Sequence, residues 1–208
     1  MIKQETYYFN NRWDLFSLIP SNATNILDVG CGNGWLGKQL KMTRSCNIVG
    51  IEVTDQGKEA EPFYDEVLIT NIEESDIPYN KGSFDCIVLG DVLEHLVDPW
   101  SALSKLVHYL KDDGSIVISI PNVGHYTTIT SLLKSRFRYE EEGILDKTHL
   151  RFFTSESFNE LISDAGLKKI KLLRNTSSGR IMRILNIVSF GLLNDLITFQ
   201  FLAVSVKE

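Results

Sequence analysis

A stretch near the start of the sequence, ILDVGCGNGWLG (26–37), joins an apolar run to one acid, Asp28. Four glycines follow within eight residues, at Gly30, Gly32, Gly34 and Gly37. Glycines placed directly after a strand let the backbone approach a ligand closely, and here they predict a binding loop. The last three also satisfy the G-x-G-x-x-G dinucleotide fingerprint, which is weak evidence when it stands alone. The loop therefore predicts a nucleotide-like ligand and leaves its charge open.

Charge separates the two cofactors that such a loop binds, a dinucleotide with an anionic pyrophosphate and the cationic S-adenosylmethionine. A carboxylate at Asp28 repels a pyrophosphate and attracts an ammonium or sulfonium group. No Lys or Arg lies between Asp28 and Gly37. Glu52, at the end of the second apolar run, can accept both hydroxyls of a ribose, which suits either cofactor. Asp91, after Gly90, adds a third acid. Three acids around one pocket favour the cationic cofactor.

Short β-rich runs alternate with helical patterns along the whole chain. The runs lie at 26–29, 48–51, 67–69, 84–89, 116–120, 169–173 and 201–206. Most are continuous rather than alternating, as expected for strands covered on both faces. Asp98 and Pro99 begin one helix, which the turn 111–114 ends, and Thr154 caps another helix that ends at Gly166. This order predicts an open α/β sheet with helices on both faces, whose ligand binds beyond the carboxyl ends of the strands.

Length and composition narrow the class further. A chain of 208 residues suits one domain, and a net charge of −6 without a basic block argues against a nucleic-acid partner. Three cysteines without a CxxC pair indicate a reducing cytoplasm and predict no metal site. The first residues contain no apolar signal-peptide core. The apolar region 181–206 is interrupted by Arg183 and Asp195, so no transmembrane span is expected.

ILDVGCGNGWLG (26–37), GIEV (50–53) and FDCIVLGDVLEHLVDP (84–99), in this order, resemble class I S-adenosylmethionine-dependent methyltransferases. The resemblance extends over most of the chain and is closest to ubiquinone-biosynthesis-type O-methyltransferases and small methyltransferases of bacterial glycan-assembly clusters. It implies a Rossmann-like, seven-stranded, mostly parallel sheet whose last strand is antiparallel. With this fold we expect one domain over 1–208. Its special parts are a leading helical segment over 1–23, an acceptor-side insertion over 121–153 after the fifth strand, and an apolar cover or association segment over 175–199.

The same resemblance implies roles for individual residues at the cofactor site. Asp28, with the backbone of the glycine loop at Gly30, Gly32 and Gly34, would hold the methionine end, and Glu52 would bind the ribose. The further contacts implied are Val53 on the adenine, Asn71 near the adenine amino group (usually an aspartate in the family), Gly90 and Asp91 along the methionine portion, and Arg12 on the cofactor carboxylate.

Transfer of a methyl group to a hydroxyl oxygen benefits from a general base. His125 in PNVGHY (121–126) and His149 in GILDKTHLRFFT (143–154) have the pKa range that a base near neutrality needs. His149 is favoured because Asp146 and Arg151 accompany it. The alternative, that His149 only pins the insertion to the next helix, stays open.

The sequence is therefore interpreted as a methyltransferase that uses S-adenosylmethionine on an oxygen of a small molecule or glycan precursor. The alternatives are an NAD-dependent oxidoreductase and a catalytically silent S-adenosylmethionine-binding module. The apolar stretch 181–193 is expected to be a buried or self-associating surface, such as a homodimer contact through 181–199. Membrane contact is disfavoured because its Lys and Arg flanks are sparse.

Overall fold

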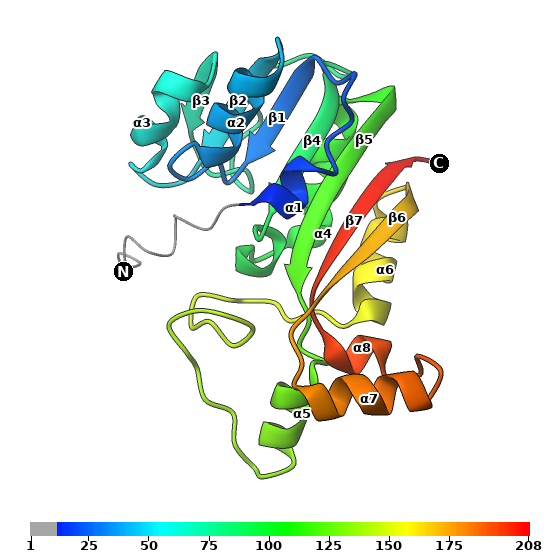
Figure 1. Ribbon diagram of the computed structural model, residues 1–208. Coiled ribbons are helices and arrows are strands. Elements are labelled where there is room, and N and C mark those ends of the chain that lie inside the picture. The colour runs from blue at the N-terminus through cyan, green and yellow to red at the C-terminus, as the bar shows by residue number, and fades with distance from the viewer. Residues whose placement is uncertain (1–11) are drawn as a thin grey trace.

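The computed structural model describes residues 12–208 and contains one seven-stranded sheet (Figure 1). Its strands, in chain order, are β1 (Asn25–Val29), β2 (Asn47–Glu52), β3 (Glu66–Ile69), β4 (Phe84–Gly90), β5 (Leu110–Pro121), β6 (Leu167–Thr176) and β7 (Thr198–Lys207). They lie in the order β3-β2-β1-β4-β5-β7-β6. Only β7 runs antiparallel to its neighbours, β5 and β6. The predicted Rossmann-like sheet with an antiparallel last strand is confirmed.

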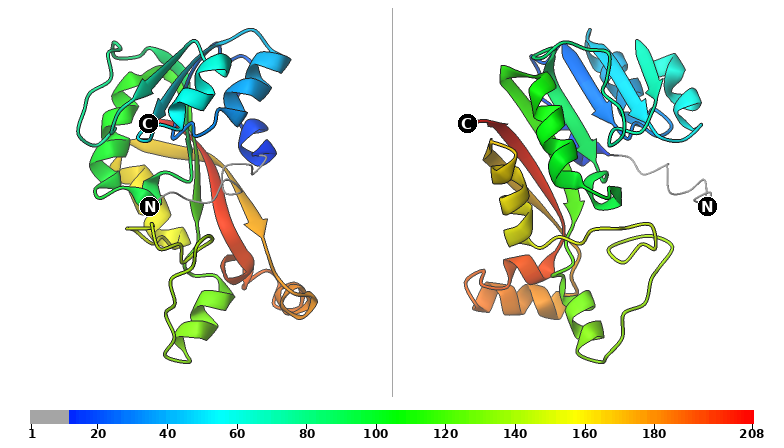
Figure 2. Two further views of the ribbon diagram at one scale, coloured as in Figure 1. Left: turned by 90° about the vertical axis from the view of Figure 1, so that its left-hand side faces the viewer. Right: turned by 180° about the vertical axis from the view of Figure 1, so that it is seen from behind.

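Helices cover both faces of the sheet (Figure 2). The helices are α1 (Trp13–Phe16), α2 (Trp35–Thr43), α3 (Gly57–Ala60), α4 (Pro99–Tyr109), α5 (Tyr126–Leu132), α6 (Ser155–Asp164), α7 (Arg180–Val188) and α8 (Asn194–Ile197), with short 3-10 turns η2 (Glu61–Phe63) and η3 (Leu93–His95). The buried side chains of α1 and α2 pack in one apolar cluster, and those of α4 and α6 pack in a second. The strands are buried from both sides, which explains why their sequences read as continuous apolar runs.

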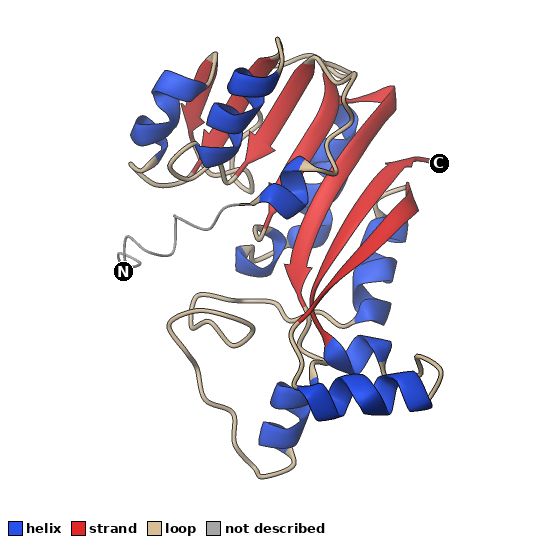
Figure 3. Ribbon diagram, in the orientation of Figure 1, coloured by secondary structure: helices blue, strands red, loops and turns tan. Residues whose placement is uncertain are grey.

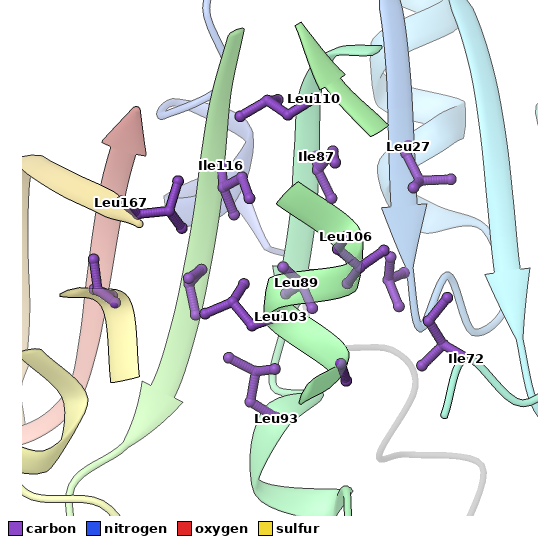
Figure 4. Packing of buried hydrophobic residues seen from close by; sticks show 14 of the residues in the cluster. Leu27, Ile72, Ile87, Leu89, Leu93, Leu103, Leu106, Leu110, Ile116 and Leu167 are labelled. Atoms are coloured by element: carbon purple, nitrogen blue, oxygen red, sulfur yellow. The ribbon is translucent and has the colours of Figure 1, made fainter. Parts of the chain in front are cut away.

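The larger cluster lies between the central strands and α4 (Figure 4). Leu103 and Leu106 of α4 are fully buried, as are Ile87 and Leu89 of β4. Residues three apart on a helix share one face, so the stripe predicted from the sequence is the face that meets the sheet. This packing fixes the carboxyl end of β4, from which the predicted site residues follow.

Local signals placed three of the four predicted helix ends correctly. Asp98 accepts a hydrogen bond from the backbone N of Ser101 at 3.1 Å, and Thr154 forms a capping box with Ser157. Gly166 ends the region after α6 with a φ of +70°. The predicted turn at 111–114 is wrong, because these residues belong to the long strand β5.

The insertion after β5 contains the helix α5 and then a long irregular segment that returns to α6 (Figure 3). Asn122 and Phe153 form a parallel bridge that closes the base of the insertion. Helices α7 and α8 lie at the same end of the molecule as α5 (Figure 1). Of the predicted leading segment 1–23, residues 1–11 lie outside the described part. Within residues 12–208, no helix is long and apolar enough to cross a membrane.

Candidate active site

A cavity of about 1480 Å³ opens at the carboxyl ends of β1, β2 and β4. The glycine loop lines one part of it, and the insertion residues 138–149 line the opposite part, which we call the acceptor side. Eight of the lining residues are Asp or Glu, whereas two are Arg. An electrostatic field of this sign attracts a cationic guest and disfavours a pyrophosphate.

The glycine loop needs glycine for two physical reasons. Gly30, Gly32 and Gly34 have φ values of +74°, +52° and +85°, in the left-handed region that other residues rarely adopt. A Cβ atom on Gly34 would also lie 2.7 Å from the Cα atom of Ala60. The loop therefore forms a cradle of backbone that packs against Ala60 on one side and lines the cavity on the other.

Asp28 is the last residue but one of β1, beneath this loop, and is only 4% exposed. The hydroxyl of Tyr64 donates a hydrogen bond to its carboxylate and accepts one from the backbone N of Gly37 at 3.1 Å. Burial raises the pKa of Asp28 to about 7, and the nearby charge of Glu52 adds to the rise, while the Tyr64 hydrogen bond opposes it. A buried carboxylate of this kind gains most from a cationic partner. The cradle and Asp28 together fit the methionine end of S-adenosylmethionine.

Glu52 accepts backbone hydrogen bonds that the sequence did not predict. One carboxylate oxygen accepts a hydrogen bond from the backbone N of Gly32 at 3.1 Å. The other accepts from the backbone N atoms of Val53 and Thr54, each at 3.0 Å. The predicted ribose acid thus also ties the glycine loop to the end of β2. Asn71 also lines the cavity, with its side chain bonded to Glu73 and Glu74, and Val53 lines it with 65% exposure.

Arg12 contacts two protein carboxylates, and its predicted pairing with a cofactor carboxylate stays a prediction. Its guanidinium forms ion pairs with Asp91 and with Asp14, and Nη2 donates to the hydroxyl of Ser119 at 2.8 Å. Asp91 also accepts a hydrogen bond from Gln200 at 2.6 Å. Both Arg12 and Asp91 line the cavity, so the network forms part of its wall.

Gly90, the residue before Asp91, also lines the cavity and allows α1 to approach the end of β4. A Cβ atom there would lie 2.6 Å from Cδ1 of Leu15. A side chain at this position would therefore require Leu15 to shift, at the point where the first helix packs over the strand.

Glu94, His95 and His149 meet on the acceptor side. One ligand atom from each lies within 4.8 Å of the others, and the two imidazole rings pack edge to face with centroids 4.7 Å apart. Nδ1 of His149 lies 3.1 Å from the carbonyl oxygen of Ile144, and Nδ1 of His95 lies 3.2 Å from that of Thr148. Because a carbonyl only accepts, each ring carries a proton on Nδ1, and Nε2 is the atom at which the ring gains or loses its other proton. Such a set can take up a proton or hold a divalent cation.

The insertion is fastened to this cluster through its backbone. The carbonyl oxygen of Glu94 accepts hydrogen bonds from the backbone N atoms of Leu150 and Arg151, at 2.8 and 3.0 Å. Asp146, fully buried, accepts from the backbone N and the hydroxyl of Thr148 at 2.8 and 2.7 Å. These contacts bring His149 from a segment distant in sequence to the end of β4.

His125 occupies a different place. It precedes α5, is 2% exposed, and does not appear among the described residues that line the cavity. Nε2 donates to the carbonyl oxygen of Ser177 and Nδ1 accepts from the hydroxyl of Thr127, both at 2.8 Å. Burial lowers its pKa. His125 thus joins α5 to the segment before α7, and the structure brings only His149 of the two predicted bases to the cavity.

Sequence reasoning missed several residues at the site. Tyr64, Ser119 and Gln200 contact Asp28 or Asp91 from positions distant in the chain, and no local pattern marks them. Glu94 had a usable signal, since it follows the fourth strand next to a histidine, directly at the predicted ligand-binding edge.

This fold and site define a class of α/β proteins that bind a nucleoside-type cofactor at the ends of parallel strands. A family model described as a methyltransferase domain matches residues 2–172. The chain is 30% identical over 175 residues to the mitochondrial ubiquinone biosynthesis O-methyltransferase of Bos taurus, covering 77% of this chain and 46% of that protein. It is 24% identical to a glycine/sarcosine/dimethylglycine N-methyltransferase of Actinopolyspora halophila, covering 73% of this chain and 26% of that protein. The chain thus belongs to the methyltransferase family, within its S-adenosylmethionine-dependent class I. It spans about half the length of the first relative and about a quarter of the second.

Solved structures agree on the fold. A SAM-dependent methyltransferase from Archaeoglobus fulgidus superimposes with a TM-score of 0.70 at 18% identity, covering 94% of this chain and 91% of that one. The cyclase SpnF superimposes with a TM-score of 0.66 at 17% identity, covering 93% and 79%. At such identities the likeness concerns the fold alone.

Proposed function

We propose that the protein transfers the methyl group of S-adenosylmethionine to a hydroxyl oxygen of a small molecule or glycan precursor. The observation that carries the proposal is one cavity that joins the acid-lined glycine loop to the cluster of Glu94, His95 and His149. Family membership supports the cofactor. The cavity volume, about 1480 Å³, exceeds the roughly 300–1,000 Å³ of an ordinary ligand site, which leaves room for an acceptor beside the cofactor.

The cofactor would be held by residues around the loop. Asp28 would pair with its ammonium group, the backbone at Gly30 and Gly32 would enclose the methionine end, and Glu52 would accept the ribose hydroxyls. Val53 and Asn71 would flank the adenine. When bound, the cofactor would supply a methyl group on a sulfonium sulfur, and the neutral thioether left after transfer is a good leaving group. The protein therefore has to orient the acceptor and exclude water.

The acceptor hydroxyl needs to lose a proton, and His149 is the proposed base. Its Nδ1 is fixed on the carbonyl of Ile144, so Nε2 is the atom that can take the proton. A nearby carboxylate, Glu94, stabilises the imidazolium that forms. His95, packed edge to face on His149, holds the ring in position.

The same cluster supports a second chemistry. Two imidazoles and one carboxylate are a donor set that holds a divalent cation, which would lower the pKa of a bound hydroxyl instead of removing its proton directly. The sequence predicts no metal, and that prediction can be tested by chelation.

Two measurements test the proposal. Calorimetry should detect binding of S-adenosylhomocysteine and none of NAD. Release of S-adenosylhomocysteine should then follow incubation with S-adenosylmethionine and one of a panel of phenols, sugars and sugar nucleotides. Binding without turnover on any acceptor would favour the silent module. Turnover on amines alone would overturn the assignment to oxygen.

We also propose a reducing compartment such as the cytoplasm. Cys31, Cys46 and Cys86 are buried free thiols, and burial raises the pKa of Cys86 to about 12, so these residues behave as small apolar groups.

A further inference from the structure

Helix α7 turns its apolar face outward. The residues at helical spacing Ile181, Ile184, Leu185 and Val188 are 75%, 52%, 48% and 70% exposed. The face toward the protein carries Met182 together with the polar side chains of Asn186 and Ser189. Asn186 donates to Asn194 at 3.0 Å and accepts from the backbone N of Leu193 at 3.1 Å. These bonds fix the rotation of the helix, so the exposure of its apolar face is built into the fold.

The apolar surface continues beyond the helix. Phe190 is 98% exposed and Leu192 is 86% exposed in the turn that follows α7. Phe190 has a φ of +53°, a left-handed conformation that is rare for a bulky residue. The turn is held by a hydrogen bond from the backbone N of Gly191 to the carbonyl of Asn186 at 2.8 Å. An apolar surface of this kind marks a contact site.

Helix α5 lies at the same end of the molecule as this surface. His125, before α5, bonds to Ser177, before α7, and both views in Figures 1 and 2 place the two helices at the same end of the molecule. Leu133 at the end of α5 is 81% exposed. Lys134 and Arg136 follow it and are exposed as well. We call these two segments, 132–136 and 180–192, the basic apolar lobe.

Charge identifies what the lobe contacts. The lobe contains four Lys or Arg and no Asp or Glu, whereas the rest of the chain contains 17 Lys or Arg against 27 Asp or Glu. Exposed Arg180 and Arg183 border the apolar face of α7. A second copy of the chain meeting this lobe through the same surface would bring like charges together. An anionic lipid surface offers both an apolar interior and opposite charge.

We propose that the basic apolar lobe docks the protein on an anionic lipid bilayer. The apolar side chains of α7 and of the turn after it enter the boundary between headgroups and acyl chains, while the Lys and Arg side chains contact the lipid headgroups. The sequence alone disfavoured this contact because few Lys or Arg residues flank 181–193. In the fold, Lys134 and Arg136 follow α5, which lies at the same end of the molecule as α7, and they add two exposed cations to this end. The insertion that begins with α5 also lines the acceptor side, so docking places the cavity near the lipid surface.

Flotation of the full chain with vesicles tests the proposal. The protein is expected to float with vesicles of phosphatidylcholine containing phosphatidylglycerol, and to remain behind with pure phosphatidylcholine or at high salt. Phe190→Asp combined with Ile187→Asp should abolish flotation. Arg180→Glu combined with Arg183→Glu should lower it by more than five-fold for each site, since each cation near the surface contributes about that factor.

The controls separate docking from folding and from self-association. Met42→Asp, on α2 and 72% exposed, changes an apolar residue far from the lobe and should float like the unchanged protein. All variants should retain binding of S-adenosylhomocysteine, because none of these residues lines the cavity. Absence of flotation would overturn the proposal. A dimer in sedimentation equilibrium that Phe190→Asp converts to monomers would assign the lobe to a second copy instead.

Discussion

Asp28 makes the binding of a cationic cofactor depend on pH, and Tyr64 sets the pH at which this dependence falls. Burial raises the pKa of Asp28 to about 7, so in the ligand-free protein the group is about half protonated at that pH. Only the carboxylate pairs with an ammonium or sulfonium. Affinity for S-adenosylmethionine should therefore fall about ten-fold for each pH unit below the pKa, and above it should level off until the cofactor's own ammonium group begins to lose its proton.

Tyr64→Phe removes the hydroxyl that donates to Asp28. A hydrogen bond to a charged group contributes about 1.5–3 kcal/mol, and one pKa unit corresponds to about 1.4 kcal/mol, so the pKa of Asp28 should rise by about 1–2 units. At neutral pH the variant should bind the cofactor about ten-fold more weakly or worse. At a pH above the raised pKa of Asp28 in the variant, the two proteins should bind nearly equally, because Asp28 is then ionised in both.

Calorimetry with S-adenosylhomocysteine, repeated from about pH 6 to about pH 9.5, measures both plateaus. Tyr79→Phe is the matched control, because the Tyr79 hydroxyl donates to Glu66 away from the cavity. Asp28→Asn should bind weakly and without pH dependence over this range. The reasoning is refuted if the unchanged protein binds equally at all pH values. It is also refuted if Tyr64→Phe weakens binding by the same factor throughout, which would mean that the ring acts by packing alone.

Four further outcomes follow from the geometry. His149→Ala should lower turnover by about 10²–10⁴-fold while the dissociation constant of S-adenosylhomocysteine stays unchanged, and equal turnover would remove the base role. EDTA should leave turnover intact, whereas a loss reversed by added Mg²⁺ or Mn²⁺ would make the three-residue cluster a cation site. Gly34→Ala should destabilise the protein more than Gly166→Ala in urea titrations, since both have positive φ but only the Cβ on Gly34 would collide with Ala60. Asp28→Asn should stabilise the ligand-free protein in thermal unfolding above pH 7. Below the unfolded pKa of about 3.9, Asp28 is protonated in both states and costs no stability. Above the folded pKa it is ionised in both states, and its burial lowers the free energy of unfolding by up to ~4 kcal/mol. An equal melting difference at acidic pH would therefore contradict the assignment.

The sequence by itself determined the order of the strands, the starts of α4 and α6, and the acids that line the cavity around the glycine loop. Continuous apolar runs, the cap at Thr154 and the glycine at Gly166 are local signals, because each depends on a few neighbouring residues. Asp28 and Glu52 could be placed at one edge because parallel strands end together. The charge preference of the cavity followed from the same reasoning.

Only the tertiary structure decided which groups meet across the chain. Tyr64 reaches Asp28 over 36 residues, and Arg12 reaches Asp91 over 79. His149 joins Glu94 because backbone bonds fasten the insertion to η3, whereas His125 is turned toward the segment before α7. The apolar face of α7 was visible in the sequence, but its outward orientation depends on hydrogen bonds with α8. Contacts of this kind arise from packing between distant segments, and no local pattern of residues records them.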